Sequence, residues 1–271
     1  KNDIMQFYNS DYDNVESYIE QLTRSNIKTN TLRRKIACMK VFYNYLKYQN
    51  IIEENPFNQL RFQFRTEKVL PKTIPYDILK SIFIYLEQKV IVSKTDYQKQ
   101  HAERNLLIIS LLLSTGIRIS ELCHIHLKDI NLSNKTLHII GKGKKERILF
   151  LGDQKTFNLL ETYINKTRNE SNDFLFPGKH SLKPLSEQSV RLVIKRIVEQ
   201  NNFSRTITPH MFRHSFATML LDSDVDIRYI QQILGHSSIS ITQIYTHVSH
   251  SKQKEILSSF NPVSAIHSDK K

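Results

Sequence analysis

Cysteine is nearly absent from this chain of 271 residues, where only Cys38 and Cys123 occur, without paired spacing. A disulfide framework or a structural zinc site needs several cysteines or histidines in short repeated spacings. His124 and His126 stand two residues apart, and on a helix such side chains point in different directions. We therefore expect no metal ion, and we expect a reducing, cytoplasmic compartment.

Long hydrophobic runs are missing as well. The longest apolar stretch, residues 106–113, is short and contains Ser110, whereas a membrane-spanning helix needs about 20 apolar residues. The first ten residues are polar and lack the apolar core of a secretory signal peptide. We expect a globular protein with no membrane partner.

Acidic residues are too few to balance the basic ones. Asp and Glu number 26 against 39 Lys and Arg, which gives a net charge of +13. Such an excess attracts polyanions and steers them over long distances. A basic protein without a nucleic-acid partner remains the alternative, because charge alone does not identify the ligand.

The first 65 residues carry the apolar spacing of helices. One helix is predicted over residues 13–24, and a second runs from the capping residues at 29–31 to about Tyr48. Three basic side chains recur every seven residues along the flank of the second helix, namely Arg33, Lys40 and Lys47. They form either a solvated helix edge or a row of phosphate contacts.

A polar segment bounded by proline, residues 66–73, is the predicted linker. Beyond it the pattern is again mostly helical, except that residues 135–140 and 146–151 alternate around a glycine-containing hairpin turn. The helices predicted there are at about 75–90, 102–114, 153–168, 186–201, 208–221, 226–234, 238–245 and 251–260. The expected fold class is mainly α with a small antiparallel β-sheet. The expected domains are a helical domain at 1–65 and a larger one at 74–271, which ends in an amphipathic tail at 249–271.

Cleavage of a phosphodiester without a metal needs cationic donors for the phosphate oxygens, a nucleophile, and an acid for the leaving oxygen. Arg118 follows a predicted helix end at Gly116, and Glu121, three residues on, would be its neighbour. Lys142 lies at the tip of the predicted hairpin. Taken singly, these are more typical of a surface ion pair and a basic turn.

A second group of candidates lies further along the chain. Pro209 favours a helix start, so His210 and Arg213 would share a face. Gly235 is a plausible helix stop that would expose His236. Tyr245 follows nine residues later, but it is one of twelve tyrosines, and spacing alone does not select it.

Taken together and in order, these stretches resemble the tyrosine recombinase (phage-integrase-type) family, most closely its Xer-like members. Each motif is weak or moderate singly, whereas five in the family's order make chance resemblance negligible. The likeness extends more loosely over the N-terminal helices. The matching segments are residues 115–122, 140–147, 208–218, 233–238 and 242–247.

The resemblance implies a site-specific DNA recombinase that needs no cofactor and works through a 3′-phosphotyrosyl intermediate. Tyr245 would be the nucleophile, and Arg118 and Arg213 would clamp the scissile phosphate. The remaining members of the implied site are Lys142 as the acid for the 5′ oxygen, His210 for proton transfer, His236 as a phosphate ligand, and Glu121 in support.

The resemblance also implies partners. The helical core-binding domain and the catalytic domain would clamp double-stranded DNA carrying specific recombination sites. The backbone contacts expected are Arg33, Lys40, Lys47, Lys144 and Lys145. A homotetramer on paired sites is expected, with the tail at 249–271 docked into a neighbouring protomer; packing on its own domain is the alternative.

The biological role stays open among resolution, excision and integration, as does the use of accessory proteins or accessory DNA sites. Two other functions also remain. A relative of type IB topoisomerases would relax DNA without paired sites, and an inert architectural protein would bind DNA without cutting it.

Overall fold

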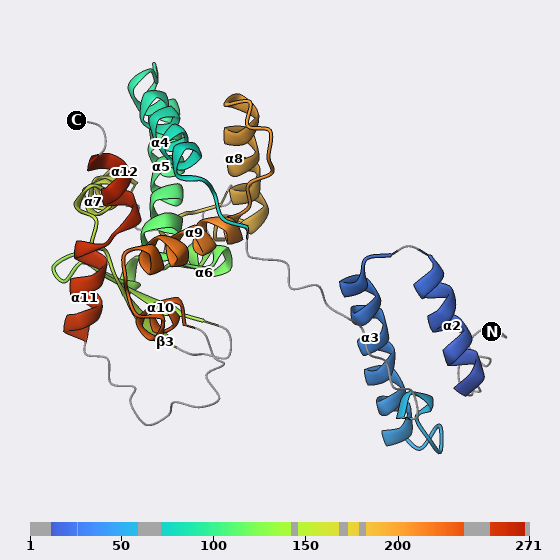
Figure 1. Cartoon of the computed structure of the whole chain (residues 1–271). Coiled ribbons are helices and arrows are strands. Elements are labelled where there is room, and N and C mark those ends of the chain that lie inside the picture. Colours follow the sequence, from blue (N-terminus) through green and yellow to red (C-terminus); the bar gives the residue numbers. More distant parts are fainter. Residues whose placement is uncertain are drawn as a thin grey trace. The chain divides into compact units, whose positions relative to one another are not determined.

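The chain forms two compact units, Lys1–Leu70 and Pro71–Lys271 (Figure 1). The computed structural model describes residues 12–25, 27–58, 72–141, 146–167, 173–178, 183–235 and 250–268. The predicted linker at 66–73 lies almost wholly outside the described residues, which resume at Lys72. Each unit has its own hydrophobic core.

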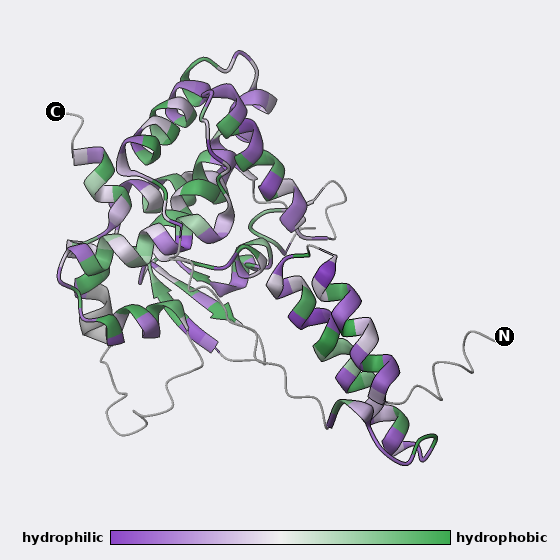
Figure 2. Cartoon of the chain, turned by 45° about the vertical axis from the view of Figure 1, so that its right-hand side comes forward, coloured by the Kyte–Doolittle hydropathy of each residue, from purple (hydrophilic) through white to green (hydrophobic). Residues whose placement is uncertain are grey.

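In its described residues the N-terminal unit has two helices and a short 3₁₀ turn, η1 (Pro56–Asn58). Helices α2 (Tyr12–Arg24) and α3 (Thr29–Tyr48) confirm the two helices predicted from apolar spacing. Figure 2 shows hydrophobic and hydrophilic residues alternating along both helices, which is the pattern that buries one face. The core consists of Val15, Ile19, Leu22, Leu32, Ile36, Tyr43, Leu46 and Phe57.

The C-terminal unit is organised around one buried helix, α5 (Asp96–Thr115), which packs against α4 (Tyr76–Ile91), α7 (Gln154–Thr167) and α9 (Pro209–Asp222). Every residue of α5 from 107 to 115 is buried. The sequence predicted that this helix starts at Ala102, but it starts six residues earlier. The reason is the N-cap Thr95, whose hydroxyl accepts a hydrogen bond from the Gln98 backbone N–H.

A three-stranded antiparallel sheet of order β1-β2-β3 interrupts the helices. Strands β2 (Thr136–Ile140) and β3 (Glu146–Phe150) form the predicted hairpin, with Ile140 opposite Glu146. Its tip, residues 142–145, lies outside the described residues. Strand β1 (Ile130–Asn131) was not predicted, because two residues are too short to show alternation.

The C-terminal unit contains further helical elements between these helices and strands. Among the helices that the structure describes, none has the length and apolar character needed to cross a bilayer. The helix predicted at 238–245 lies outside the described residues. These further elements are α6 (Ile119–Cys123), the 3₁₀ turn η2 (Leu127–Asp129), α8 (Glu187–Gln200) and α10 (Ile227–Leu234).

The C-terminal tail packs on its own unit through α11 (His250–Ser259) and α12 (Pro262–Ser268). Helix α12 lies against α4, α5, α7 and α9, and the backbone at Leu257 approaches Gly152 so closely that no Cβ fits there. In this single chain the tail therefore packs on its own unit, which was the alternative to docking in a neighbouring protomer, while Phe260 stays exposed. Its fully buried side chains are Leu257, Val263 and Ile266.

Candidate active site

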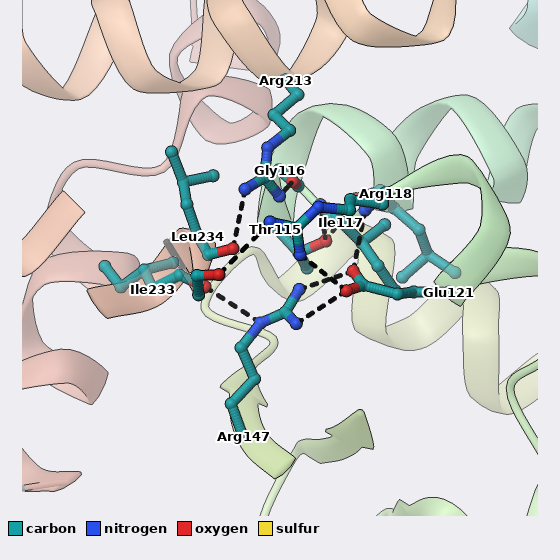
Figure 3. A network of polar contacts seen from close by, with 11 residues as sticks. Thr115, Gly116, Ile117, Arg118, Glu121, Arg147, Arg213, Ile233 and Leu234 are labelled. Atoms are coloured by element: carbon teal, nitrogen blue, oxygen red, sulfur yellow. Dashed lines mark hydrogen bonds and ion pairs between the residues drawn. The ribbon is translucent and has the colours of Figure 1, made fainter. Parts of the chain in front are cut away.

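Two helix C-termini meet at the centre of the candidate site. Helix α5 ends at Gly116 with φ of 61°, and α10 ends at Gly235 with φ of 66°. A Cβ at Gly116 would collide with the side chains of Phe216 and Leu234. Glycine is therefore required there both by this crowding and by the positive φ. The last carbonyls of a helix lack intrahelical partners and carry partial negative charge. Three arginines from other elements donate to these carbonyls (Figure 3).

Arg213 links the two helix ends directly. Its Nη1 donates to the Gly116 carbonyl at 2.7 Å and its Nη2 to the Leu234 carbonyl at 2.7 Å. The residue is only 7% exposed. Burial, together with the charges of Arg118 and Arg147, lowers the pKa of Arg213 to about 10. The guanidinium of Arg213 therefore remains charged at neutral pH, although the positive charges of Arg118 and Arg147 lie close to it.

Arg118 stands at the N-cap of α6, between the two helix ends, and its side chain is 36% exposed. Its Nη1 donates to Glu121 Oε1 at 2.8 Å, and its Nη2 donates to the Gly235 carbonyl at 3.2 Å. Its backbone N–H donates to Glu121 Oε2 at 3.0 Å. The neighbouring pair expected from the three-residue spacing is present, and Glu121 fixes both the backbone and the guanidinium of Arg118.

Arg147 was not singled out from the sequence, although its segment was. It stands on β3 and donates twice to Glu121, from Nη1 to Oε1 at 3.0 Å and from Nη2 to Oε2 at 2.7 Å. Its Nε donates to the Ile233 carbonyl at 3.2 Å. An arginine in a short strand near a basic turn resembles a surface residue in sequence, but this side chain is only 12% exposed.

The charges of this arginine cluster (Arg118, Arg147, Arg213 and Glu121) do not balance. Three guanidinium groups face one carboxylate, which leaves two positive charges uncompensated. Burial by itself raises the pKa of Glu121, but the hydrogen bonds and charge of Arg147 and Arg118 outweigh it and lower the pKa to about 2. The carboxylate stays ionised, and the cluster as a whole is suited to binding an anion.

The pKa of Glu121 makes stability depend on pH. A folded-state pKa of about 2 against an ordinary value of 4.5 gives stabilisation that is complete above pH 4.5 and is lost as pH falls towards 2. We expect Glu121→Gln to lower the free energy of unfolding by about 3 kcal/mol at neutral pH, and the deficit to shrink steadily below pH 5. Urea unfolding of both proteins between pH 7 and pH 2.5 measures this.

The control for that series is Glu199→Gln, which removes an exposed carboxylate paired with Lys195 at 3.6 Å. It should change stability by less than about 1 kcal/mol at every pH. A Glu121→Gln deficit that stays constant from pH 7 to pH 3 would show that the arginines do not hold this carboxylate ionised.

His210 lies one turn before Arg213 on α9, and its side chain is exposed. The next histidine on that face, His214, has its pKa lowered by burial first and then by the charges of His210 and Arg213. His210 also lines a cavity of about 630 Å³ whose wall includes Arg191 and Arg205. The same wall includes Ile119, which follows Arg118 in sequence, and the acidic residue Glu199.

Several predicted residues fall outside the described part of the chain. Lys142, Lys144 and Lys145 belong to the hairpin tip, and His236 and Tyr245 lie within 236–249. The chain next to them is described: Glu146 begins β3, and Gly235, whose carbonyl accepts from Arg118, precedes His236 in sequence. Within the described residues, no three His, Cys, Asp or Glu side chains gather as metal ligands.

The basic residues predicted on the N-terminal unit are exposed. Arg33, Lys40 and Lys47 all lie on α3, away from the core residues of that helix. Among the described residues none of the three forms an ion pair. The structure leaves both interpretations of this row open, a solvated edge or a set of phosphate contacts.

Comparison with known proteins gives one consistent result. The sequence model described as the phage integrase family matches residues 85–252. A tyrosine recombinase of Agathobacter rectalis is 48% identical over 278 aligned positions, which cover 98% of this chain and 90% of that protein. The tyrosine recombinase XerC of Bacillus subtilis is 32% identical over 263 positions, 94% of this chain and 83% of its own length.

Solved structures agree with the sequence comparison. The site-specific recombinase XerH, bound to its difH substrate in a pre-cleavage complex, is 25% identical with a TM-score of 0.67. The match covers 93% of this chain and 71% of that one. The segment that the family model matches, residues 85–252, contains the whole arginine cluster and positions 142, 210, 236 and 245.

Proposed function

The chain belongs to the phage integrase family of tyrosine recombinases and is a site-specific DNA recombinase, and from that premise we propose how its residues carry out strand cleavage and rejoining. The observation that supports the proposal is the arginine cluster. Two uncompensated positive charges, held at two glycine-capped helix ends, form a preorganised site for a phosphodiester.

In this proposal Arg118 and Arg213 bind the non-bridging oxygens of the scissile phosphate. Attack on phosphorus adds negative charge to these oxygens, so fixed guanidinium donors bind the transition state more strongly than the ground state. Arg213 is locked by two backbone carbonyls and Arg118 by Glu121. Little reorganisation is then needed at the moment of reaction, which is the main source of such electrostatic catalysis.

Tyr245 supplies the nucleophile. An ordinary tyrosine has a pKa near 10 and is almost fully protonated at neutral pH, so its proton must leave as the Oη–phosphorus bond forms. His210, one turn from Arg213 on α9, is the proposed acceptor of that proton. Lys142 donates a proton to the departing 5′ oxygen, and His236, directly after Gly235, donates a hydrogen bond to the phosphate.

Rejoining reverses these steps on a new strand. The 5′-hydroxyl attacks the phosphotyrosyl ester, the Oη–phosphorus bond breaks, and the tyrosine recovers its proton. One ester replaces another in each direction, so the bond energy of the phosphodiester is retained and no nucleotide cofactor is consumed.

The partner is double-stranded DNA with specific recombination sites. XerH, which is similar to this chain, has been solved with its difH substrate. We place the backbone contacts at Arg33, Lys40 and Lys47 on α3, and at Lys144 and Lys145 in the hairpin. A row of like charges on one helix flank suits a phosphate backbone, which determines position rather than sequence preference.

Recombination between two sites would use four copies of the chain. Because α11 and α12 bury their apolar residues within their own unit, the proposed tetramer requires either another surface or release of this tail. The cytoplasmic location also belongs to the proposal, supported by the free thiols of Cys38 and Cys123.

Two-site plasmids separate recombination from simple relaxation. The target is first recovered by sequencing DNA trapped covalently on the protein, and two copies are cloned into a supercoiled plasmid. We expect deletion circles from direct repeats and inversion from inverted repeats, measured by restriction digestion. A one-site plasmid is the control and should yield neither product.

Relaxation of both plasmids without either product would contradict the proposal and favour a topoisomerase. Binding without any change in the DNA would favour an architectural protein. Both outcomes can be read from the same gel, next to Tyr245→Phe as a catalytically dead reference.

A further inference from the structure

We propose that Arg147 is a positioning residue for DNA cleavage, acting through Glu121 on the phosphate-binding Arg118 and through the end of α10 on the chain that leads to His236. The inference rests on the proposed function, because Arg147 would position residues of that same active site. We assign Arg147 no contact with the phosphate, because all three of its guanidinium nitrogens already donate within the protein, two to Glu121 and one to the Ile233 carbonyl.

The carboxylate of Glu121 accepts hydrogen bonds from two arginines, Arg118 and Arg147. Oε1 accepts from Arg118 Nη1 at 2.8 Å and from Arg147 Nη1 at 3.0 Å. Oε2 accepts from the Arg118 backbone N–H at 3.0 Å and from Arg147 Nη2 at 2.7 Å. Four donors fix the plane of the carboxylate, and two of the four come from Arg147 (Figure 3).

Because Arg147 occupies part of the Glu121 carboxylate, more of the hydrogen-bond donors of Arg118 remain available to a phosphate. One carboxylate facing one guanidinium would form a neutral fork-to-fork pair, in which Arg118 turns both Nη atoms towards Glu121. Arg147 occupies that bidentate position instead. Arg118 is left with one side-chain bond to Glu121, and its 36% exposed side chain remains positively charged and available to a phosphate.

The third donor of Arg147, its Nε, contacts the C-terminal end of α10. Nε donates to the Ile233 carbonyl at 3.2 Å, and a Cβ at Gly235 would lie 3.2 to 3.4 Å from the Arg147 side chain. The end of α10 is therefore packed directly on this guanidinium. Arg147 stands two residues after the hairpin tip that carries Lys142, so one side chain connects three segments of the proposed site.

A lysine cannot reproduce these contacts, which gives a sharp test. Arg147→Lys keeps the charge but has a single ammonium in place of a planar fork, so it cannot bind both carboxylate oxygens and the Ile233 carbonyl together. We expect Arg147→Gln and Arg147→Lys to slow single-turnover formation of the covalent adduct by about 100-fold and at least 10-fold respectively, in line with the cost of a small misplacement of reacting groups. DNA affinity should change less than about 3-fold.

A double-variant cycle distinguishes a positioning role of Arg147 from a general loss of folding. Rates of adduct formation are measured at saturating protein and well below each melting temperature, for Arg147→Gln, Glu121→Gln and the two combined. If Arg147 acts through Glu121, the rate of the combined variant should lie within about 3-fold of the rate of the slower single variant. Arg228→Gln, which removes the exposed partner of Asp226 at the opposite end of α10, is the matched control and should retain the wild-type rate.

Three results overturn the inference. A wild-type rate in Arg147→Gln would remove the role of Arg147 altogether. Single-variant losses that multiply in the combined variant would overturn its action through Glu121. Both results would leave the proposed function intact. A wild-type protein that forms no Tyr245-dependent adduct on its recovered site would instead overturn the proposed function, and the role of Arg147 with it.

Discussion

Tyr245→Phe is expected to abolish covalent attachment of the protein to DNA. The substitution removes only the phenol oxygen, which is the atom proposed to bond with phosphorus. Deleting the nucleophile of a covalent mechanism costs at least about 10⁴-fold in rate, so no adduct should be visible. DNA affinity should stay within about 2-fold, because the neutral hydroxyl adds little to contacts dominated by phosphate charge.

A suicide substrate makes this measurable. A duplex nicked close to the scissile phosphate loses its short 5′-hydroxyl fragment after cleavage, which prevents rejoining and traps the adduct on a denaturing gel. Tyr229→Phe is the matched control: it makes the same change at a partly buried tyrosine of α10 and should give the wild-type yield. A persistent adduct in Tyr245→Phe would place the nucleophile elsewhere.

The fold was predictable where side-chain spacing reflects burial. The hairpin strands, α7, α8 and α9 were all predicted within about two residues, because each buries one face and exposes the other. The first turn of α5, which has no apolar period, was missed. The tail pattern predicted that an apolar face is buried, but no pattern within one chain states which molecule buries it.

For the arginine cluster, the sequence predicted three of the four residues but not the contacts between them. The motifs selected Arg118, Glu121 and Arg213, and the structure brings these three together. The two arginines also donate to backbone carbonyls, such as that of Gly116 for Arg213 across 97 positions of sequence. A carbonyl leaves no trace in residue type, and the same holds for the Ile233 carbonyl bound by Arg147, so the network itself could not be inferred before folding.

Arg118→Ala and Arg213→Ala are expected to share one effect and differ in another. Both remove a donor to the scissile phosphate, so both should slow adduct formation by about 10³-fold, as loss of a transition-state donor does. Arg213 supports the fold more strongly, since its removal leaves the carbonyls of Gly116 and Leu234 without their donors in a buried setting, whereas the bond from Arg118 to the Gly235 carbonyl is exposed to water. Arg213→Ala should therefore cost about 3 kcal/mol in unfolding free energy, while Arg118→Ala should cost less than about 1, because Arg147 still holds Glu121.

Adduct formation, filter binding and urea unfolding on the same protein preparations test this pair, with Arg228→Ala as the control for loss of one arginine charge. The phosphate clamp requires that cleavage falls far more than DNA affinity, because the two guanidinium groups bind most strongly to charge that exists only in the transition state. If affinity and cleavage fell equally in both variants, the arginines would be general DNA contacts, and the charge surplus around Glu121 would serve binding alone.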